Sequence, residues 1–183
     1  MNTQDVVDVA VKYGTAYGSE EIRVMADAML TYLPVRATIV EIGCQYGCST
    51  SAILTMAKER GHRVYCVDPF TFEETGKQDD VGPKFLRSML TFEVPFAVLA
   101  MRSADALQWA PQVIDMVHID GDHSKEGVEF DCGVWLPRVR PGGLAVCHDY
   151  GRCGAPDVKP VVDAHTQGWK VLCTDGLWIG VKP

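Results

Sequence analysis

The chain has 183 residues, of which 47% are hydrophobic and 22% are charged, and its formal net charge is −7 at pH 7. That length suits one well-cored domain, and the composition is ordinary for a soluble globular fold. The negative charge argues against nucleic acid or an anionic membrane as the main partner, because both bind basic faces.

The lack of a recognisable targeting signal and the spacing of the cysteines favour a cytoplasmic protein. No apolar run reaches the roughly 18 residues that a membrane helix needs, and the first residues, MNTQDVVD, lack the basic and apolar regions of a signal peptide. The seven cysteines include no C-x-x-C pair, so neither a zinc ribbon nor a thioredoxin-like site is indicated. We interpret them as buried or incidental thiols in a reducing compartment.

Two helices are predicted before residue 36. Apolar residues recur at helical spacing from Ile22 to Leu33 and predict an amphipathic helix over 19–33, which ends before Pro34. A shorter helix is predicted over 4–13. We expect residues 1–35 to form a helical cover on a core of residues 36–183, all within one domain.

From residue 37, short runs rich in valine and isoleucine alternate with helical stretches. Parallel strands need crossover connections, so this alternation predicts a parallel sheet with helices on both faces. The turn-like Thr174-Asp175-Gly176 predicts a closing hairpin that puts an antiparallel strand at the sheet edge. The predicted strands cover 38–42, 63–67, 96–101, 115–119, 143–147, 169–173 and 177–181, and the predicted helices cover 49–60, 82–92, 104–109, 125–137 and 160–167.

Polar residues recur at the carboxyl ends of the predicted strands. In open sheets of this type, ligands bind outside those ends. Scattered surface residues would not recur at one edge, so the pattern predicts a functional site there. The residues delivered to this edge are Glu41, Gly43, Asp68, Arg102, Ser103, Asp120, Asp122, His123, His148 and Asp149.

The first of these strands leads into a glycine turn. Gly43 and Gly47 allow positive φ and close approach of a ligand, and the free N–H groups of the following helix attract polar groups. Ser49 can cap those donors, although such a turn can also be purely structural. The turn is neither a G-x-G-x-x-G fingerprint nor a P-loop, and Asp68 follows Gly43 by 25 residues. An adenosine-containing ligand without a pyrophosphate therefore fits better than NAD.

Four ordered motifs resemble class I S-adenosylmethionine (SAM)-dependent methyltransferases. They are Glu41-x-Gly43-x-x-x-Gly47, then Asp68, then IDGDHSKEGVEFD, then RPGGLAVCHD. The chain is most similar to the small group with DGDHSYEGV…D and LxPGGxxxxHD, related to metal-dependent sugar and macrolide O-methyltransferases. The resemblance covers roughly residues 36 to 181. It implies an α/β, Rossmann-like doubly wound sheet of seven strands, with the last strand antiparallel and helices on both faces.

The resemblance also implies which residues hold the SAM cofactor. Glu41 would lie near the amino group of the methionine portion, together with the turn from Gly43 to Gly47 and the helix start at Ser49. Asp68 would hold the ribose, and Ser103 with Arg102 would lie along the adenine. Asp120 is assigned both to the cofactor and to a metal.

Methyl transfer to oxygen needs a base, because a neutral hydroxyl is a poor nucleophile. His123 has a near-neutral unperturbed pKa, and the resemblance implies a catalytic histidine at His123 or a catalytic aspartate at Asp122. Which of the two is the base stays open. Alternatively, the DGDH segment is a solvated turn whose aspartates cap the helix over 125–137.

A divalent metal ion could lower the pKa of the acceptor hydroxyl. The resemblance implies metal ligands at Asp120 and Asp149, with an acidic residue just before the second. His148 stands there instead, which favours Mn²⁺ over Mg²⁺ or leaves the site without metal. Alternatively, His148 only bonds to backbone near the strand end. His118 is interpreted as a core histidine, and His62 and His165 as surface residues.

We therefore predict a SAM-dependent methyltransferase that modifies a hydroxyl of a small acceptor, a sugar or a secondary metabolite. The acceptor would be held by loops 69–82 and 149–160, by the N-terminal helices, or by a second subunit of a homo-oligomer. Phe70, Phe72, Tyr150 and Trp178 are candidates for its pocket, or for packing. The alternatives are an NAD(P)-dependent oxidoreductase, against which the incomplete fingerprint and the lack of a Tyr-x-x-x-Lys pair count, and a non-catalytic cofactor-binding module.

Overall fold

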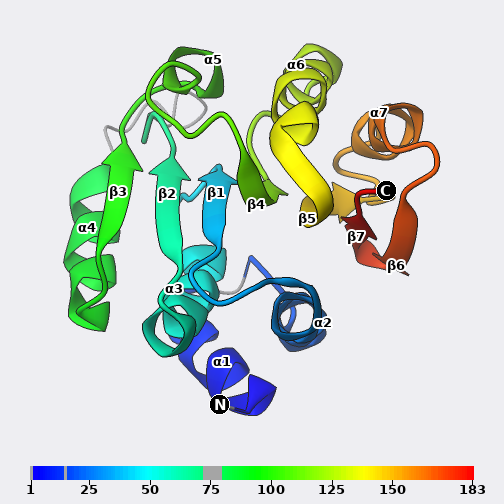
Figure 1. Cartoon of the computed structure of the whole chain (residues 1–183). Coiled ribbons are helices and arrows are strands. Elements are labelled where there is room, and N and C mark those ends of the chain that lie inside the picture. The colour runs from blue at the N-terminus through cyan, green and yellow to red at the C-terminus, as the bar shows by residue number, and fades with distance from the viewer. Residues whose placement is uncertain (1, 15, 72–79) are drawn as a thin grey trace.

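The computed structural model describes residues 2–14, 16–71 and 80–183. The strands in these ranges form one seven-stranded mixed sheet (Figure 1). The strand order is β3-β2-β1-β4-β5-β7-β6, and neighbours pair in parallel except where β7 meets β5 and β6. The predicted Rossmann-like, doubly wound fold class is confirmed. The strands are β1 (Thr38–Ile42), β2 (Arg63–Val67), β3 (Phe96–Leu99), β4 (Ile114–Ile119), β5 (Val139–Tyr150), β6 (Lys170–Thr174) and β7 (Gly176–Val181).

The closing hairpin joins the sheet differently from the prediction. β7 is antiparallel to its neighbours and lies between β5 and β6, so the antiparallel strand is one position in from the edge. The predicted edge position is therefore wrong. The last five residues of β7, LWIGV, are all buried, whereas no residue of β6 is fully buried. The more apolar strand takes the inner position, where both sheet faces are covered.

Helices cover both faces of the sheet (Figure 1). On one face α1, α2, α3 and α4 enclose a first hydrophobic core, and on the other α5, α6 and α7 enclose a second. Consecutive strand residues alternate between the two cores, since Ile39 belongs to the first and Val40 to the second. The helices are α1 (Thr3–Ala10), α2 (Ser19–Tyr32), α3 (Cys48–Arg60), α4 (Val81–Met89), α5 (Ser103–Ala106), α6 (Lys125–Trp135) and α7 (Val158–His165), with 3₁₀ turns at Leu90–Phe92 and Leu136–Arg138.

Local chemistry sets the helix ends. α3 stops at Arg60 because Gly61 takes a φ of +69° and its N–H bonds back to the Ala57 carbonyl. α6 begins after Ser124, whose hydroxyl accepts a hydrogen bond from the Gly127 N–H. The helices predicted over 82–92 and 125–137 both finish in a 3₁₀ turn, so the α-helical part is shorter than the apolar spacing indicated.

The first two helices pack against the sheet and α3. α1 contacts α2 and α3, while α2 contacts β5 and β7. Val6, Met25 and Met29 are completely buried in this layer. None of the helices in the described ranges has the length and apolar character needed to cross a membrane.

All seven cysteines are free, and the interpretation of them as buried thiols is confirmed for five. Cys153 is exposed, and Cys173 is half-buried. The buried five are Cys44, Cys48, Cys66, Cys132 and Cys147.

His62 is interpreted from the sequence as a surface residue, and this is wrong, because it is only 3% exposed. Its Nδ1 accepts a hydrogen bond of 3.1 Å from the Ala37 N–H, so the bond requires an unprotonated Nδ1. Burial and the positive charge of Arg60 lower the pKa of His62 to about 4, against the opposing charge of Asp115.

We expect His62 to make the fold sensitive to acid. The unfolded chain binds a proton at His62 near its ordinary pKa of about 6.5, while the folded chain resists it down to about pH 4. Its contribution to stability is therefore complete above pH 6.5 and is lost as the pH falls toward 4. The expected loss is about 2 kcal/mol in the free energy of unfolding at about pH 4.5.

Urea unfolding between about pH 7.5 and 4.5 measures this loss in the wild type and in His62→Asn. The asparagine keeps an acceptor for the Ala37 N–H but does not titrate, so its stability should fall less steeply. The same pH dependence in both proteins would contradict the assignment.

Candidate active site

The carboxyl edge of the sheet brings together side chains that follow β4 and β5. Asp120 is the first residue after β4, and His148 and Asp149 lie near the end of β5. The two strands pair in parallel with Ile119 opposite Cys147, so their ends lie side by side. His123 joins from the loop between β4 and α6. Side chains that the sequence assigns to one edge therefore do meet in space.

Asp120 is the centre of this cluster. Its Oδ1 lies 3.2 Å from His123 Nε2 and 3.2 Å from His148 Nδ1. The same two ring nitrogens lie 3.5 Å and 3.6 Å from Asp149 Oδ2. Two imidazoles thus face two carboxylates closely enough for strong electrostatic attraction when the rings are protonated.

Asp149 reaches the cluster because its backbone leaves the regular strand geometry. Consecutive strand residues normally point to opposite faces, which would separate Asp149 from His148. The pairing of β5 with β7 shifts register between His148 and Tyr150, and Asp149 adopts a φ of +56°. A left-handed conformation at a residue other than glycine is strained, and such strain is concentrated at functional sites.

The charges in the cluster favour an ionised Asp120. Although burial opposes ionisation, hydrogen bonds from His123 and His148 lower the pKa of Asp120 well below its usual range. The hydrogen bond to Asp120 raises the pKa of His123. Burial lowers the pKa of His148, but the bond to Asp120 and the charges of Asp149 and Glu21 outweigh it, so the net shift is upward.

The two histidines differ in access to solvent. The His123 side chain is 37% exposed, whereas that of His148 is 6% exposed. His123 is therefore the ring that a bound molecule can reach, and His148 is a buried partner of the carboxylates.

The glycine turn after β1 lies directly against the end of β4. Gly43 has a φ of +81°, and a Cβ at this position would come within 1.9 Å of the Asp120 carbonyl oxygen. The Asp120 N–H also donates a 2.8 Å hydrogen bond to the Ile42 carbonyl. The turn assigned to the cofactor and the cluster assigned to the chemistry thus share backbone contacts.

Asp68, which follows β2, holds the glycine turn by hydrogen bonds. Its Oδ2 accepts from the N–H groups of Cys44 and Gln45, each at 2.8 Å, and its Oδ1 accepts from the Phe70 N–H at 2.6 Å. A carboxylate has about four acceptor positions, so about one stays open for a ligand hydroxyl. The ribose contact stays a prediction, and ordering of the turn is a second role for Asp68.

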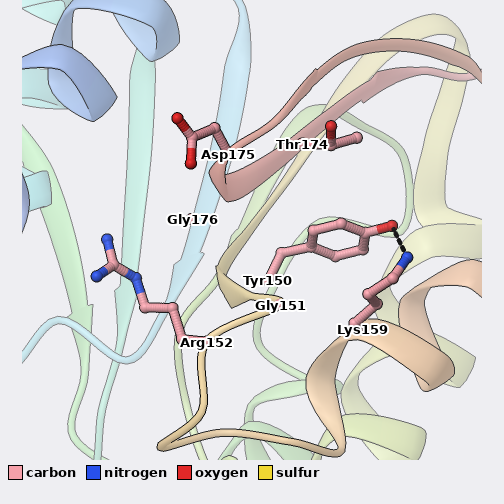
Figure 2. A pocket seen from close by; sticks show the side chains of 7 residues that line it. All are labelled: Tyr150, Gly151, Arg152, Lys159, Thr174, Asp175 and Gly176. Carbon is pink, nitrogen blue, oxygen red and sulfur yellow. Dashed lines mark hydrogen bonds between the residues drawn. The ribbon is translucent and has the colours of Figure 1, made fainter.

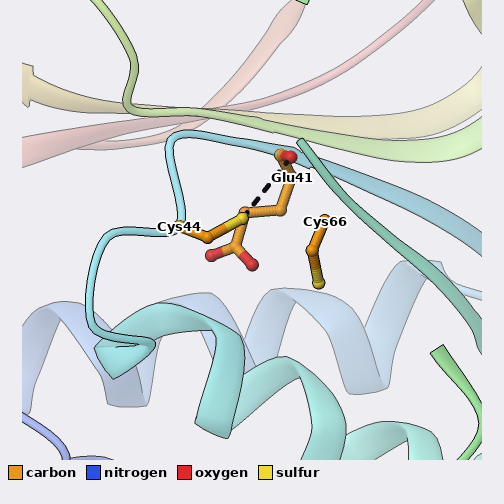
Figure 3. A group of neighbouring side chains, drawn as sticks. All are labelled: Glu41, Cys44 and Cys66. Atoms are coloured by element: carbon orange, nitrogen blue, oxygen red, sulfur yellow. Dashed lines mark hydrogen bonds between the residues drawn. The ribbon is translucent and has the colours of Figure 1, made fainter. Parts of the chain in front are cut away.

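Glu41 points from β1 toward α3 and is completely buried (Figure 3). Its Oε1 accepts a 2.6 Å hydrogen bond from Ser49, and its Oε2 accepts one of 2.7 Å from Thr50. The prediction that Ser49 caps the first turn of α3 is wrong. A buried carboxylate needs donors, so the hydroxyl serves Glu41, and the cap position is Gly47. Burial raises the pKa of Glu41 to about 7 despite these two bonds.

Two thiols adjoin Glu41, and the ligand atoms of Glu41, Cys44 and Cys66 lie within 4.8 Å of one another (Figure 3). Burial raises the pKa of the Cys44 thiol well above its usual value, so the thiol stays protonated and is a poor metal ligand. Both oxygens of Glu41 already have hydrogen-bond donors. This arrangement agrees with the interpretation of the cysteines as incidental.

Ser103 and Asp122 lie beside the site. Ser103 begins α5, and its hydroxyl interacts with Asp131, a carboxyl whose pKa burial raises to about 6. Asp122 Oδ1 accepts a 2.9 Å hydrogen bond from the Ser124 N–H, which shapes the turn into α6. The alternative that an aspartate caps this helix is wrong, because the cap is Ser124.

A hollow of about 490 Å³ opens where the end of β5 meets the turn between β6 and β7 (Figure 2). Arg152 connects it to the cluster, since its Nε lies 3.2 Å from Asp149 Oδ1. On the other side, Lys159 Nζ donates a 2.7 Å hydrogen bond to the Tyr150 hydroxyl. The lining residues are Tyr150, Gly151, Arg152, Lys159, Thr174, Asp175 and Gly176.

The aromatic residues considered for an acceptor pocket have different positions. Tyr150 lines the hollow. Trp178 is 1% exposed and belongs to the core, and Phe70 packs against Phe85. Phe72 lies outside the described residues.

Three side chains around the cluster make contacts that the sequence patterns do not predict. The Tyr17 hydroxyl donates a 2.6 Å hydrogen bond to Asp120 Oδ2 from a position 103 residues away in the chain. Glu21 accepts a 2.5 Å hydrogen bond from Arg152. His118 is buried as expected, but it also contacts the Tyr17 hydroxyl, with its Nε2 at 3.0 Å. Tyr17 and Glu21 lie in a segment with no motif, so no sequence signal marks them.

The donor set of the cluster fits a divalent cation. Asp120, His123 and Asp149 offer ligand atoms within 4.8 Å of one another, and His148 Nδ1 is equally close to both carboxylates. Neighbouring ligands around an octahedral ion with bonds of about 2.1 Å stand about 3 Å apart, close to the separations here. Two carboxylates together with an imidazole nitrogen, from either His123 or His148, suit Mn²⁺ better than Mg²⁺.

Comparison with sequence families gives one match. The model of a family described as a methyltransferase domain matches residues 40–150, which include the glycine turn, Asp68 and the DGDH segment. No curated protein sequence matches the chain.

Solved structures share the fold at low sequence identity. A TDP-rhamnose 3'-O-methyltransferase of calicheamicin biosynthesis aligns with a TM-score of 0.63 and 13% identity, over 98% of this chain and 92% of that one. An O-methyltransferase from Bacillus cereus in complex with SAH aligns with a TM-score of 0.59 and 19% identity, over 99% of this chain and 90% of that one. The mycinamycin-pathway methyltransferase MycE, in complex with Mg, SAH and mycinamycin VI, aligns with a TM-score of 0.64 and 16% identity, over 100% of this chain and 54% of that one. At these identities the similarity shows the fold alone.

Proposed function

This chain belongs to the methyltransferase domain family, and on that premise we propose that it transfers a methyl group from SAM to a hydroxyl of a small acceptor, a sugar or a secondary metabolite. The observation that carries the proposal is the meeting of His123 with Asp120 and Asp149 beside the Gly43 turn. A candidate base, two carboxylates and a glycine turn therefore share one sheet edge.

The proposed cofactor site is built from the glycine turn and the strand ends around it. The N–H groups between Gly43 and Gly47 would hold the methionine portion, with Glu41 and Ser49 fixing the start of α3 beneath it. Asp68 would accept from the ribose. At the two ends of the site, Ser103 would lie along the adenine and Asp120 would border the reacting methyl group. Bound SAM supplies a methyl group on a sulfonium, which is a good leaving group.

His123 is the proposed base. Because its Nε2 faces Asp120 and Asp149, Nδ1 is the nitrogen that would take the proton from the acceptor hydroxyl. The two carboxylates would orient the ring and stabilise the imidazolium that forms, as in other base–carboxylate pairs. Asp122 is the second candidate, and its bond to the Ser124 N–H makes it the weaker one.

A divalent cation is proposed at Asp120, His148 and Asp149. Such an ion would act as a Lewis acid that lowers the pKa of the acceptor hydroxyl. The close approach of His148 Nδ1 to both carboxylates supports this ligand set. The Mg in the MycE complex supports a cation in this fold.

The hollow beside Asp149 is the proposed position of the acceptor. Its lining mixes a guanidinium, an ammonium, a carboxylate and hydroxyls, which suits a neutral molecule with several hydroxyl groups. The TDP-rhamnose methyltransferase among the similar structures favours a sugar.

Calorimetry with SAM, SAH and NADH, each with and without Mn²⁺ or Mg²⁺, tests this function. We expect SAM and SAH to bind and NADH not to bind. Mass spectrometry with a panel of glycosides and other hydroxylated metabolites should then detect addition of one methyl group. Asp68→Asn, which weakens an acceptor for the ribose, should bind SAM more weakly than the wild type does. Binding of NADH without SAM would overturn the proposal, and SAM binding without any methylated product would favour a binding module.

A further inference from the structure

We propose that the segment Tyr17–Glu21, which leads into α2, holds the carboxylates of Asp120 and Asp149 in position. The inference rests on the proposed function, because those carboxylates are assigned there to the chemistry. The segment lies outside the 40–150 range that the family shares, so the assignment concerns this chain's own N-terminal residues.

The segment acts through two side chains, Tyr17 and Glu21, which we call its two arms. The first arm is Tyr17. Its hydroxyl donates a 2.6 Å hydrogen bond to Asp120 Oδ2, and Oδ1 of the same carboxylate faces His123 and His148. The hydrogen bond to Oδ2 opposes rotation of the carboxylate, so it favours the observed direction of Oδ1. Tyr17 is 4% exposed, so water does not compete for this bond.

The contact with His118 completes the Tyr17 arm. A tyrosine hydroxyl has one proton, and Tyr17 gives it to Asp120. His118 Nε2, 3.0 Å from the same oxygen, must therefore donate to it. Aligned donors polarise one another, so the pair strengthens the hold on Asp120.

Tyr17 also fixes the ring of His148. The two rings stack with centroids 3.9 Å apart and an angle of 28° between their planes. His148 is 6% exposed, so this stacking and the carboxylate contacts define its orientation. One side chain thereby orients two of the proposed metal ligands.

The second arm is Glu21. Its Oε2 accepts a 2.7 Å hydrogen bond from the Gly18 N–H, which anchors the carboxylate in the first turn of α2. Its Oε1 accepts from Arg152 Nη2 at 2.5 Å, and Arg152 Nε lies 3.2 Å from Asp149 Oδ1. Glu21 therefore holds Asp149 through the guanidinium between them.

Gly176 makes room for this second arm. A Cβ at Gly176 would come within 2.6 Å of Glu21 Oε1 and within 2.8 Å of Arg152 Nη2. A side chain at Gly176 would push Glu21 Oε1 and Arg152 Nη2 out of their present positions. α2, the loop after β5 and the β6–β7 turn therefore meet at the ion pair between Glu21 and Arg152.

Two substitutions test the arms, each with a matched control. Tyr17→Phe keeps the stacked ring and removes only the hydroxyl, while Tyr13→Phe removes a hydroxyl that contacts Thr91 at 3.2 Å on the surface. Glu21→Gln removes the charge that faces Arg152. Glu20→Gln changes the adjacent residue, which pairs with Arg23 at the surface.

We expect kcat for methyl transfer to fall about 10- to 100-fold in Tyr17→Phe and in Glu21→Gln, with the Kd for SAM within about twofold of the wild type. Both controls should match the wild type. A second readout needs no acceptor: in ¹⁵N-histidine spectra, Tyr17→Phe should shift the ring nitrogens of His118 and His148, and Tyr13→Phe should not.

The outcomes separate this inference from the proposed function. An unchanged kcat together with unchanged histidine signals would overturn the positioning role while leaving methyl transfer intact. A joint loss of SAM binding and melting temperature would also count against it, because that pattern indicates a purely structural role. Failure of the wild type to bind SAM would overturn the proposed function, and the histidine spectra would still decide whether Tyr17 holds the cluster.

Discussion

Replacing His123 with alanine is expected to lower kcat for methyl transfer by about 10²- to 10⁴-fold. The reason is that the acceptor hydroxyl must lose its proton as the oxygen attacks, and His123 is the accessible ring held by two carboxylates. The Kd for SAM should stay the same, because the glycine turn and Asp68 are untouched. Initial rates at saturating SAM, with calorimetry for SAM itself, measure the two effects separately.

His165→Ala is the matched control for this variant. His165 also pairs with a carboxylate, since its Nε2 lies 2.8 Å from Glu129, and it is 30% exposed, but it belongs to α7 and lies outside the cluster. We expect wild-type activity from it. A loss of less than about tenfold in His123→Ala would contradict the assignment and move the role of base to Asp122.

The pH profile of the wild type provides a second view of the same base. His123 accepts a proton only when neutral, and the hydrogen bond to Asp120 raises its pKa. Activity should therefore fall on acidification, starting above the ordinary histidine value of about 6.5. This acidic limb should disappear from the residual activity of His123→Ala.

Replacing Gly43 with alanine is expected to lower the free energy of unfolding by more than about 3 kcal/mol, or to prevent folding. The new Cβ would come within 1.9 Å of the Asp120 carbonyl oxygen, 2.5 Å of its carbonyl carbon and 2.9 Å of the Gly121 nitrogen. These are backbone atoms, so no side chain can move aside. Relief requires the end of β4 to shift, and that shift displaces Asp120.

Gly168→Ala separates this clash from the cost of the backbone angle. Gly168 has the same φ of +81°, and a Cβ there meets no heavy atom of the described residues within 4 Å. The expected loss is about 1–2 kcal/mol, from the left-handed conformation alone. Urea unfolding of both variants gives the comparison. Equal losses would mean that the close packing of the glycine turn on β4 is absent.

The positions of the buried strands could be predicted because their sequences are continuous apolar runs. β1 was expected over 38–42 and has those limits, since both of its faces are covered by helices. β5 begins at Val139, earlier than the predicted residue 143. The pattern misses this start because Pro141-Gly142-Gly143 has a composition that disfavours a strand. Gly143 has a tertiary reason: a Cβ there would come within 2.7 Å of the Asp115 carbonyl oxygen.

The candidate site was predictable only in part. Asp120, His123, His148 and Asp149 could be assigned to one edge because parallel strands end together. Their hydrogen-bond partners could not be predicted. The Ser49 hydroxyl is expected to cap α3, but it donates instead to the completely buried carboxyl group of Glu41, which needs a donor.

The sequence by itself determined the class of fold, the order of the motifs and the edge at which their polar residues gather. These follow from periodicity and from strand direction, which are properties of neighbouring residues. Only the tertiary structure decided which partners Tyr17 and Glu21 have near Asp120 and Asp149. It also decided that His62 is buried and that β7 lies between β5 and β6. Each depends on contacts between segments far apart in the chain, and these contacts depend on packing and on the demand of buried polar groups for partners.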